Sequence, residues 1–130
     1  MPEANLNLES MSVNAGKDNI VIINALTDIP GGATLDVSAL PGSVKVLNAG
    51  HIIIKTTATG VYKPLGLTGS PLAYDSKDAG DEFVGVLKAS IPVSDPRAAI
   101  VTSGVINAAA SPYPVTETIK SGLPLIQFLY

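Results

Sequence analysis

Residues 83–107, FVGVLKASIPVSDPRAAIVTSGVIN, form the longest apolar stretch of the chain that has a clear turn in its middle. Its two halves, residues 83–91 and 98–106, are rich in Val and Ile, which favour β-strands. The halves are separated by residues that interrupt a strand ladder and favour a turn: Pro92, Ser94, Asp95 and Pro96. The stretch therefore predicts a β-hairpin, and the chain built around it is expected to be rich in strands.

Shorter strands are predicted on the N-terminal side of this hairpin. A second hairpin is expected over residues 52–65, where a β-branched run is followed by the turn residues ATG. Turns at residues 28–32 and 48–50 are indicated by their Pro and Gly residues. Three brief strands are predicted at residues 19–26, 33–37 and 44–47, and the first of them is expected to be buried because Ile, Val and Leu dominate it.

The remaining segments are expected to be irregular or helical. Residues 66–82 predict a long loop, because Gly and Pro recur in them. A short helix is predicted over residues 115–121, with Pro114 in its first turn and Gly122 just after its end. The tail, LIQFLY at residues 125–130, is expected to dock on the sheet or on another subunit, because it is too apolar to leave in water.

These elements predict a mainly-β fold, a small antiparallel β-barrel or sandwich with a polar N-terminal arm and one short C-terminal helix. At 130 residues the chain has the length of one domain, so residues 19–130 are expected to form a single β-rich domain after an arm at residues 1–18. Apolar and polar residues alternate loosely in the arm, and the apolar ones are Leu6, Leu8, Met11 and Val13. Such alternation suits strand addition to a neighbouring edge, and a loose terminus is the alternative.

Composition excludes several classes of partner. The net charge is −3 and the eight Lys and Arg residues are scattered singly, so a nucleic-acid partner is not expected. No apolar run approaches the roughly 20 residues that cross a bilayer, and the first residues lack the basic and apolar regions of an export signal.

Charged residues make up only 15% of the chain, well below the usual quarter or so. Part of the surface is therefore expected to be covered by a partner or by further copies of the chain.

No constellation of residues predicts an enzyme, a cofactor or a metal site. His51 is the single histidine, there is no cysteine, and no serine lies in a G-x-S-x-G setting, so we interpret His51 as structural. The glycines do not match the phosphate-binding motifs. The adjacent Asp81 and Glu82 would point to opposite faces of a strand and could not share a proton. The acids around Lys77 do not match a calcium-binding loop, so we interpret them as a solvated charged loop.

A different function is compatible with the tyrosines. In a monomeric ligand-binding module they and the acidic loop would face a ligand, for example a carbohydrate. Isolated tyrosines more often anchor packing or an interface, and a hydrolase has no supporting constellation. The four tyrosines are Tyr62, Tyr74, Tyr113 and Tyr130.

Three stretches of the chain resemble a known family. They are AGHIIIKTTATGVYKPL at residues 49–65, EFVGVLKASIPVSDPRAAIVTSGVIN at 82–107 and PYPVTETIKSGLPLIQF at 112–128. Together they resemble phage head fibre proteins of Bacteroides-associated phages and prophages, and NAGKDNIVI and IPGGATLDVSAL near the N-terminus are similar too. The GxYxP and GVL motifs are also similar, more loosely, to the capsid decoration proteins of tailed phages. The likeness spans nearly the whole chain.

The resemblance implies a structural virion protein with no catalytic activity, made in the bacterial host cytoplasm and bound to the outside of a phage capsid as a homotrimer. Its partners would be copies of itself and the phage major capsid protein. The low charge, the apolar tail and the polar arm fit a symmetric oligomer that docks on a shell. The residues expected at its interfaces are Leu6, Leu8, Met11, Val13, Leu123, Leu125, Phe128 and Tyr130.

Overall fold

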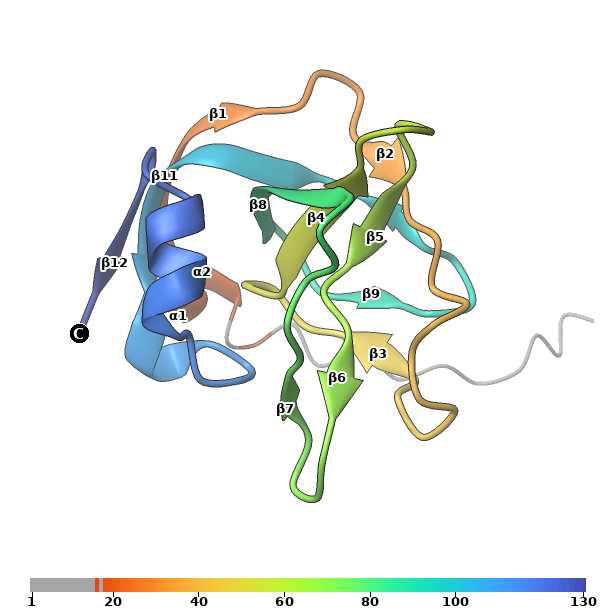
Figure 1. The fold of residues 1–130 in the computed structure, drawn as a ribbon. Coiled ribbons are helices and arrows are strands. Elements are labelled where there is room, and N and C mark those ends of the chain that lie inside the picture. Colours follow the sequence, from red (N-terminus) through yellow and green to blue (C-terminus); the bar gives the residue numbers. More distant parts are fainter. Residues whose placement is uncertain (1–15, 17) are drawn as a thin grey trace, which may run out of the picture.

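The fold is mainly β and is organised around one six-stranded sheet (Figure 1). The computed structural model describes residue 16 and residues 18–130. The strands of the main sheet follow the order β1-β11-β8-β4-β5, and β12 pairs with β11 beside this path. Their bounds are β1 (Ile22–Asp28), β4 (Ile52–Thr56), β5 (Tyr62–Pro64), β8 (Asp81–Leu87), β11 (Ile100–Asn107) and β12 (Ile126–Leu129).

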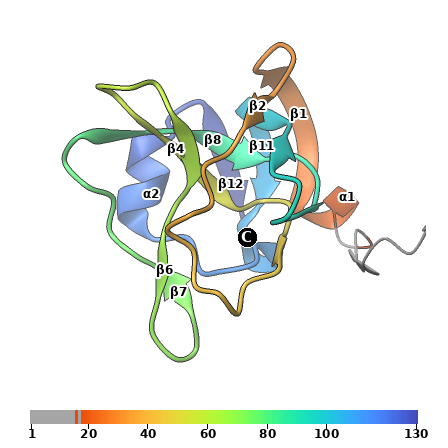
Figure 2. The same ribbon diagram turned by 90° about the vertical axis from the view of Figure 1, so that its right-hand side faces the viewer.

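Three two-stranded sheets extend the body. The strand β2 (Ala33–Thr34) pairs with β10 (Arg97–Ala98), and β3 (Val46–Leu47) pairs with β9 (Ile91–Pro92). The third sheet joins β6 (Leu67–Thr68) to β7 (Ala73–Tyr74) in a small hairpin that projects from the body in both ribbon views (Figure 2). The segment predicted as a loop over residues 66–82 therefore contains this hairpin and the start of β8. All three sheets are antiparallel.

The helices are short. They are α1 (Asp18–Val21), the 3-10 turn η1 (Ala108–Ala110) and α2 (Glu117–Gly122). The helix α2 begins two residues later than predicted, because Thr116 is its N-cap and accepts a hydrogen bond from the backbone N–H of Ile119 at 3.4 Å. Gly122 is the last helical residue rather than the one after the helix. A Cβ atom at Gly122 would overlap the ring of Phe83, so glycine is required there by packing.

The central strands are buried on both faces, which explains their continuous apolar runs. Ile52 and Ile54 of β4 lie in a core cluster with α2 and β12, whereas Ile53 between them lies in a second cluster under β2, β3 and β9. Val86 and Leu87 of β8 divide between the same two clusters. Alternate residues thus serve opposite sides of the sheet, as the two-residue period of a strand requires.

Both predicted hairpins are present, but the hairpin of residues 83–107 has a longer connection than expected. The strands β4 and β5 pair through Ile53↔Pro64 to Lys55↔Tyr62. The strands β8 and β11 pair at Ile100↔Leu87 and Val101↔Val86, and residues 88–99 between them supply β9 and β10, where only a turn at residues 92–97 was predicted. Beyond Val101, β11 leaves β8 and pairs with β1 on one side and β12 on the other.

Three further expectations need correction. In the described part of the chain no pairing joins β1 to β5, so the main sheet is open and no closed barrel forms. The strand predicted at residues 19–26 begins instead at Ile22, after the helix α1, and its burial is incomplete because it lies at the edge of the sheet. The arm boundary also shifts: Asp18 belongs to α1, and residues 1–15 and 17 lie outside the described residues.

Candidate functional site

The single histidine belongs to a cluster of three aromatic rings. His51 lies between a turn and β4, Tyr74 ends β7, and Tyr113 follows η1. Their ring centroids are 5.2 Å apart for His51 and Tyr74, 5.8 Å for His51 and Tyr113, and 5.3 Å for the two tyrosines, all in edge-to-face geometry. Edge-to-face packing is the favourable arrangement for such rings. The cluster therefore ties the β6–β7 hairpin and the segment after η1 to the main sheet.

Hydrogen bonds to the backbone complete this cluster. The Nε2 atom of His51 lies 3.0 Å from the carbonyl oxygen of Leu65, and the hydroxyl of Tyr74 accepts from the N–H of Ile52 at 3.2 Å and donates to the carbonyl of Gly50 at 3.5 Å. Burial lowers the pKa of His51 from 6.5 to about 4, partly opposed by the bond to Leu65. Burial likewise raises the pKa of Tyr74.

The chemistry available to the cluster is structural. With its lowered pKa, the imidazole of His51 is neutral at pH 7, and its Nε2–H donates to the Leu65 carbonyl. In a catalytic triad the N–H of the histidine is held by an orienting carboxylate, whereas here it is held by a backbone carbonyl. Among the residues that the structure describes, no carboxylate contacts His51, and the Tyr74 hydroxyl is hydrogen-bonded to the backbone. These contacts agree with the structural interpretation of His51.

The acidic residues lie around a hollow of about 260 Å³ between residues 36–40, β5, β6 and residues 75–81. Two of its carboxylates, those of Asp36 and Asp75, accept hydrogen bonds from serines close to them in sequence. The N–H and hydroxyl of Ser38 donate to the Asp36 carboxylate and lower its pKa, and Asp75 accepts from the N–H of Ser76. Within the described residues no group of three or more His, Cys, Asp or Glu side chains is arranged to hold a metal ion. The hollow therefore offers scattered charges rather than converging ligands.

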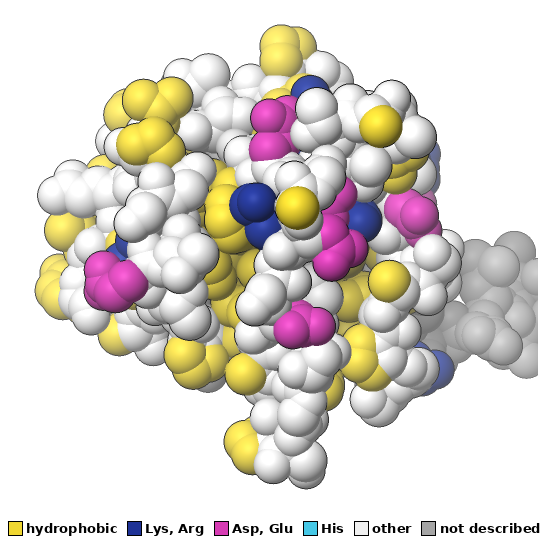
Figure 3. Space-filling view, viewed as in Figure 1, with side chains coloured by type: hydrophobic (Ala, Val, Ile, Leu, Met, Phe, Trp, Pro, Cys, Tyr) yellow, Lys and Arg dark blue, Asp and Glu magenta, His cyan; other side chains and the backbone are white. Residues whose placement is uncertain are grey.

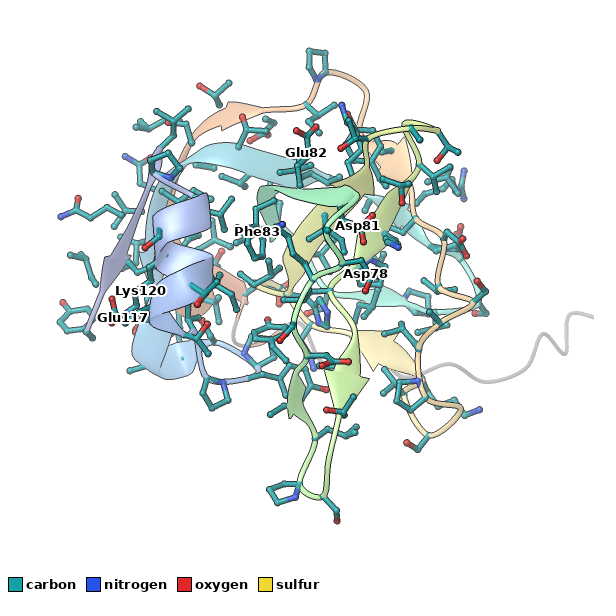
Figure 4. All side chains as sticks on the ribbon, viewed as in Figure 1. Asp78, Asp81, Glu82, Phe83, Glu117 and Lys120 are labelled. Carbon is teal, nitrogen blue, oxygen red and sulfur yellow. The ribbon has the colours of Figure 1, made fainter. Side chains whose placement is uncertain are left out.

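Two adjacent acids at the start of β8 point to opposite sides, as predicted (Figure 4). The Asp81 carboxylate is buried and lies 3.2 Å from Lys63 Nζ, whereas the exposed Glu82 lies 3.3 Å from Lys55 Nζ. Both lysines come from the neighbouring β4–β5 hairpin. Because each carboxylate has its own cation, the two acids do not form a catalytic pair.

The tyrosines do not form one sugar-binding platform. Tyr74 and Tyr113 pack against His51, and the Tyr74 ring also contacts the core. Tyr62 lies on β5 under the ammonium of Lys55, 5.8 Å from the ring centroid, at the far end of the sheet path. Tyr130 follows β12 and is 89% exposed. The four rings thus divide among three separate places.

The apolar surface that remains exposed is concentrated at the strands flanking β11. On the β12 side, Leu125 is 70% exposed and Tyr130 is 89% exposed. On the β1 side, Ile20 is 53%, Ile23 is 46% and Leu26 is 66% exposed. In the space-filling view several charged side chains lie near the centre and others at the left and right, and hydrophobic side chains are spread between them over this face (Figure 3).

The expected interface residues of the tail have different environments. Leu123 is 4% exposed and belongs to the core of its own chain, so it offers a partner little surface. Phe128 is half-buried against the same core, whereas Leu125 and Tyr130 are free to contact a partner. The tail pairs with β11 of its own sheet, which is one of the two arrangements expected for it. The other expected interface residues, Leu6, Leu8, Met11 and Val13, lie outside the described residues.

Sequence reasoning missed the exposed apolar side chains of α1 and β1. A continuous apolar segment was expected to be buried, but β1 is the edge strand of the sheet, and register shifts bring Ile23 and Leu26 to its outer side. The three-residue spacing of Ile20, Ile23 and Leu26, with Asn24 and Ala25 between the last two, was the available signal.

Comparison with protein-family models, with curated proteins and with solved structures found no match. In the described part of the chain no helix has the length and apolar character that crossing a membrane requires. The assignment of a function therefore depends on the surface and on the sequence resemblance.

Proposed function

We propose that this chain is a structural virion protein, a head fibre or capsid decoration protein that binds the outside of a phage capsid as a homotrimer. The observation that carries the proposal is the combination of an exposed apolar edge with a core whose polar groups are all engaged in structure. Leu26 and Leu125 remain in water in the single chain, while His51 and Asp81 are used internally. A surface of this kind is suited to association.

The resemblance in sequence supplies the phage context, and the fold is compatible with it. A mainly-β body with few charges is expected of a protein that packs beside copies of itself on a shell. Two apolar surfaces, one on each side of β11, would let one copy contact two neighbours. That is the requirement for a ring of three, in which each copy uses two different patches.

The arm has a defined point of attachment to the body. The carboxylate of Asp18 accepts hydrogen bonds from the N–H and the hydroxyl of Ser90 at 2.9 and 2.7 Å, and the Ser90 hydroxyl accepts from the N–H of Ala49 at 3.0 Å. The arm preceding Asp18 is proposed to contact the capsid or a neighbouring subunit. Three arms on one trimer would act together, since a second contact made from the same particle benefits from a high effective concentration.

Sedimentation with purified capsids tests the proposal. The full chain is expected to co-sediment with capsids of the phage that encodes it, and a chain lacking residues 1–17 is expected to remain folded but to be retained much less. The deletion stops before Asp18 so that the bonds to Ser90 are kept. A matched control, Glu117→Gln on an exposed helix position, is expected to bind like the wild type. Absence of the full chain from the capsid pellet would overturn the proposal.

A further inference from the structure

The three edges of the main sheet are not equally protected against pairing with another strand. Natural edge strands avoid such pairing by being short, bulged or charged, or by containing proline. The edge strand β1 has three register shifts against β11, and β5 is three residues long with Lys63 and Pro64. The strand β12 has a regular register over Gly104↔Ile126 to Asn107↔Leu129, and residues 125–130 include no charged side chain and no proline.

Part of the backbone of β12 faces away from β11. The carbonyl of Leu125 accepts a hydrogen bond from the N–H of Gly104, so Leu125 and every second residue after it face β11 in the parallel ladder. Phe128 lies between two of these residues, so its N–H and carbonyl point away from β11. Among the described residues β12 pairs with no strand other than β11. Its outer edge is open to one more strand.

We infer that this outer edge of β12 is occupied by residues 5–9 of a neighbouring copy, added as a strand. The inference rests on the proposed homotrimer and names the partner of its tail surface. Leu6 and Leu8 alternate with Asn5, Asn7 and Glu9, which is the pattern of a strand with one apolar face. Added beside β12, the apolar positions extend the side that carries Phe128, and the polar positions extend the side that carries the exposed Gln127.

Symmetry favours the arm over a second β12 as the occupant. Two β12 strands that paired with each other would form an isologous contact, which closes a dimer and leaves no edge for a third copy. An arm that inserts beside the β12 of the next copy forms a heterologous contact, which can close a ring of three. The helix α1, which follows the arm, lies at the same end of the sheet as β12, because both α1 and β12 contact η1.

Disulfide trapping tests the inference cleanly, because the natural chain has no cysteine. In the full-length protein, Gln127→Cys is combined in turn with Asn5→Cys, Asn7→Cys, Leu6→Cys and Leu8→Cys, and mild oxidation is followed by non-reducing electrophoresis. Neighbouring strands bring side chains on the same face within disulfide distance, and those on opposite faces point apart. We expect covalent dimers and trimers with at least one of the Asn5 and Asn7 variants, at yields several-fold above those with Leu6 and Leu8.

Two controls separate this inference from the proposed function. Combining Asn7→Cys with Asn24→Cys, on the exposed edge of β1, is expected to give little crosslinking. The mass of the untreated wild type is measured in parallel, because a trimer without any of these crosslinks would overturn the inference while leaving the proposed trimer standing. A disulfide formed only within one chain, or equal yields from the Asn and Leu positions, would also overturn it. A monomeric wild type would instead remove the proposed trimer on which the inference rests.

Discussion

The carboxylate of Asp81 on β8 lies 3.2 Å from Nζ of Lys63 on β5, and the Asp81 side chain is only 4% exposed. Removing the cation would leave a buried charge without a partner, which is costly. Lys63→Met, which keeps the apolar stem, is expected to lower the free energy of unfolding by about 2 kcal/mol. Urea denaturation measures this loss.

The neighbouring pair provides the matched control. Lys55 and Glu82 are 31% and 53% exposed, so their ion pair is screened by water. Lys55→Met is expected to cost less than about 1 kcal/mol. Equal losses in the two variants would show that burial of Asp81 does not set the strength of its pair.

The burial of His51 predicts a dependence of stability on pH. The pKa falls from 6.5 to about 4 on folding, so the unfolded chain binds the proton more readily between these values. The neutral imidazole makes its full contribution to the free energy of unfolding above about pH 6.5. This contribution falls by about 1.4 kcal/mol per pH unit as the pH decreases towards about 4. Chemical denaturation at a series of pH values measures the slope.

His51→Gln separates this effect from the carboxylates that titrate in the same range. Glutamine retains an N–H donor but no proton-binding ring nitrogen, so the variant is expected to lack the extra slope, whatever its absolute stability. Parallel pH profiles for the two proteins would contradict the assignment of the slope to His51.

A glycine in the main sheet is required by close approach of two backbones. A Cβ atom at Gly104 would overlap the carbonyl oxygen of Asn24 on β1. Gly104→Ala is therefore expected to separate β1 from β11 and to lower the free energy of unfolding by about 3 kcal/mol. At Gly42 a Cβ atom would meet nothing within 4 Å, so Gly42→Ala is the control and is expected to be neutral in the same denaturation experiment. A neutral Gly104→Ala would mean that β1 can shift without cost.

The tail residues allow assembly to be separated from folding. Leu125 is 70% exposed, so Leu125→Asp is expected to leave the body folded while converting a trimer of about 40 kDa, three times the 13.3 kDa chain, to monomers. Phe128→Asp is expected to reduce stability as well, because Phe128 packs on the core. Light scattering and circular dichroism measure mass and folding. Val61→Asp, 40% exposed beside β5, is the control and should retain the mass of the wild type. Trimeric Leu125→Asp would exclude the tail as an interface.

Local signals in the sequence predicted much of the fold. The β-branched run that begins at Ile52 predicted β4, and the ATG turn after it predicted the hairpin with β5. The hairpin of residues 83–107 was predicted too, with a turn at residues 92–97. The strands β9 and β10 in its connection were not predicted, because their partners lie near residues 46 and 34 and no local pattern reveals them. The parallel pairing of β12 with β11 is likewise a long-range choice.

The candidate site was less predictable than the fold. The opposite directions of Asp81 and Glu82 follow from the period of a strand, and so were predicted correctly. The contacts of His51 with Tyr74 and Tyr113 join three distant segments, so no spacing in the sequence indicates them. The exposure of Leu26 depends on β1 being an edge strand, which only the assembled sheet decides.

A three-dimensional map of the intact virion tests the central claim most directly. The account predicts density with three-fold symmetry on the outer face of the capsid, into which three copies of the β body fit with β12 turned towards a neighbouring copy. Purified virions that lack this protein, or density that places it inside the shell, would contradict the account.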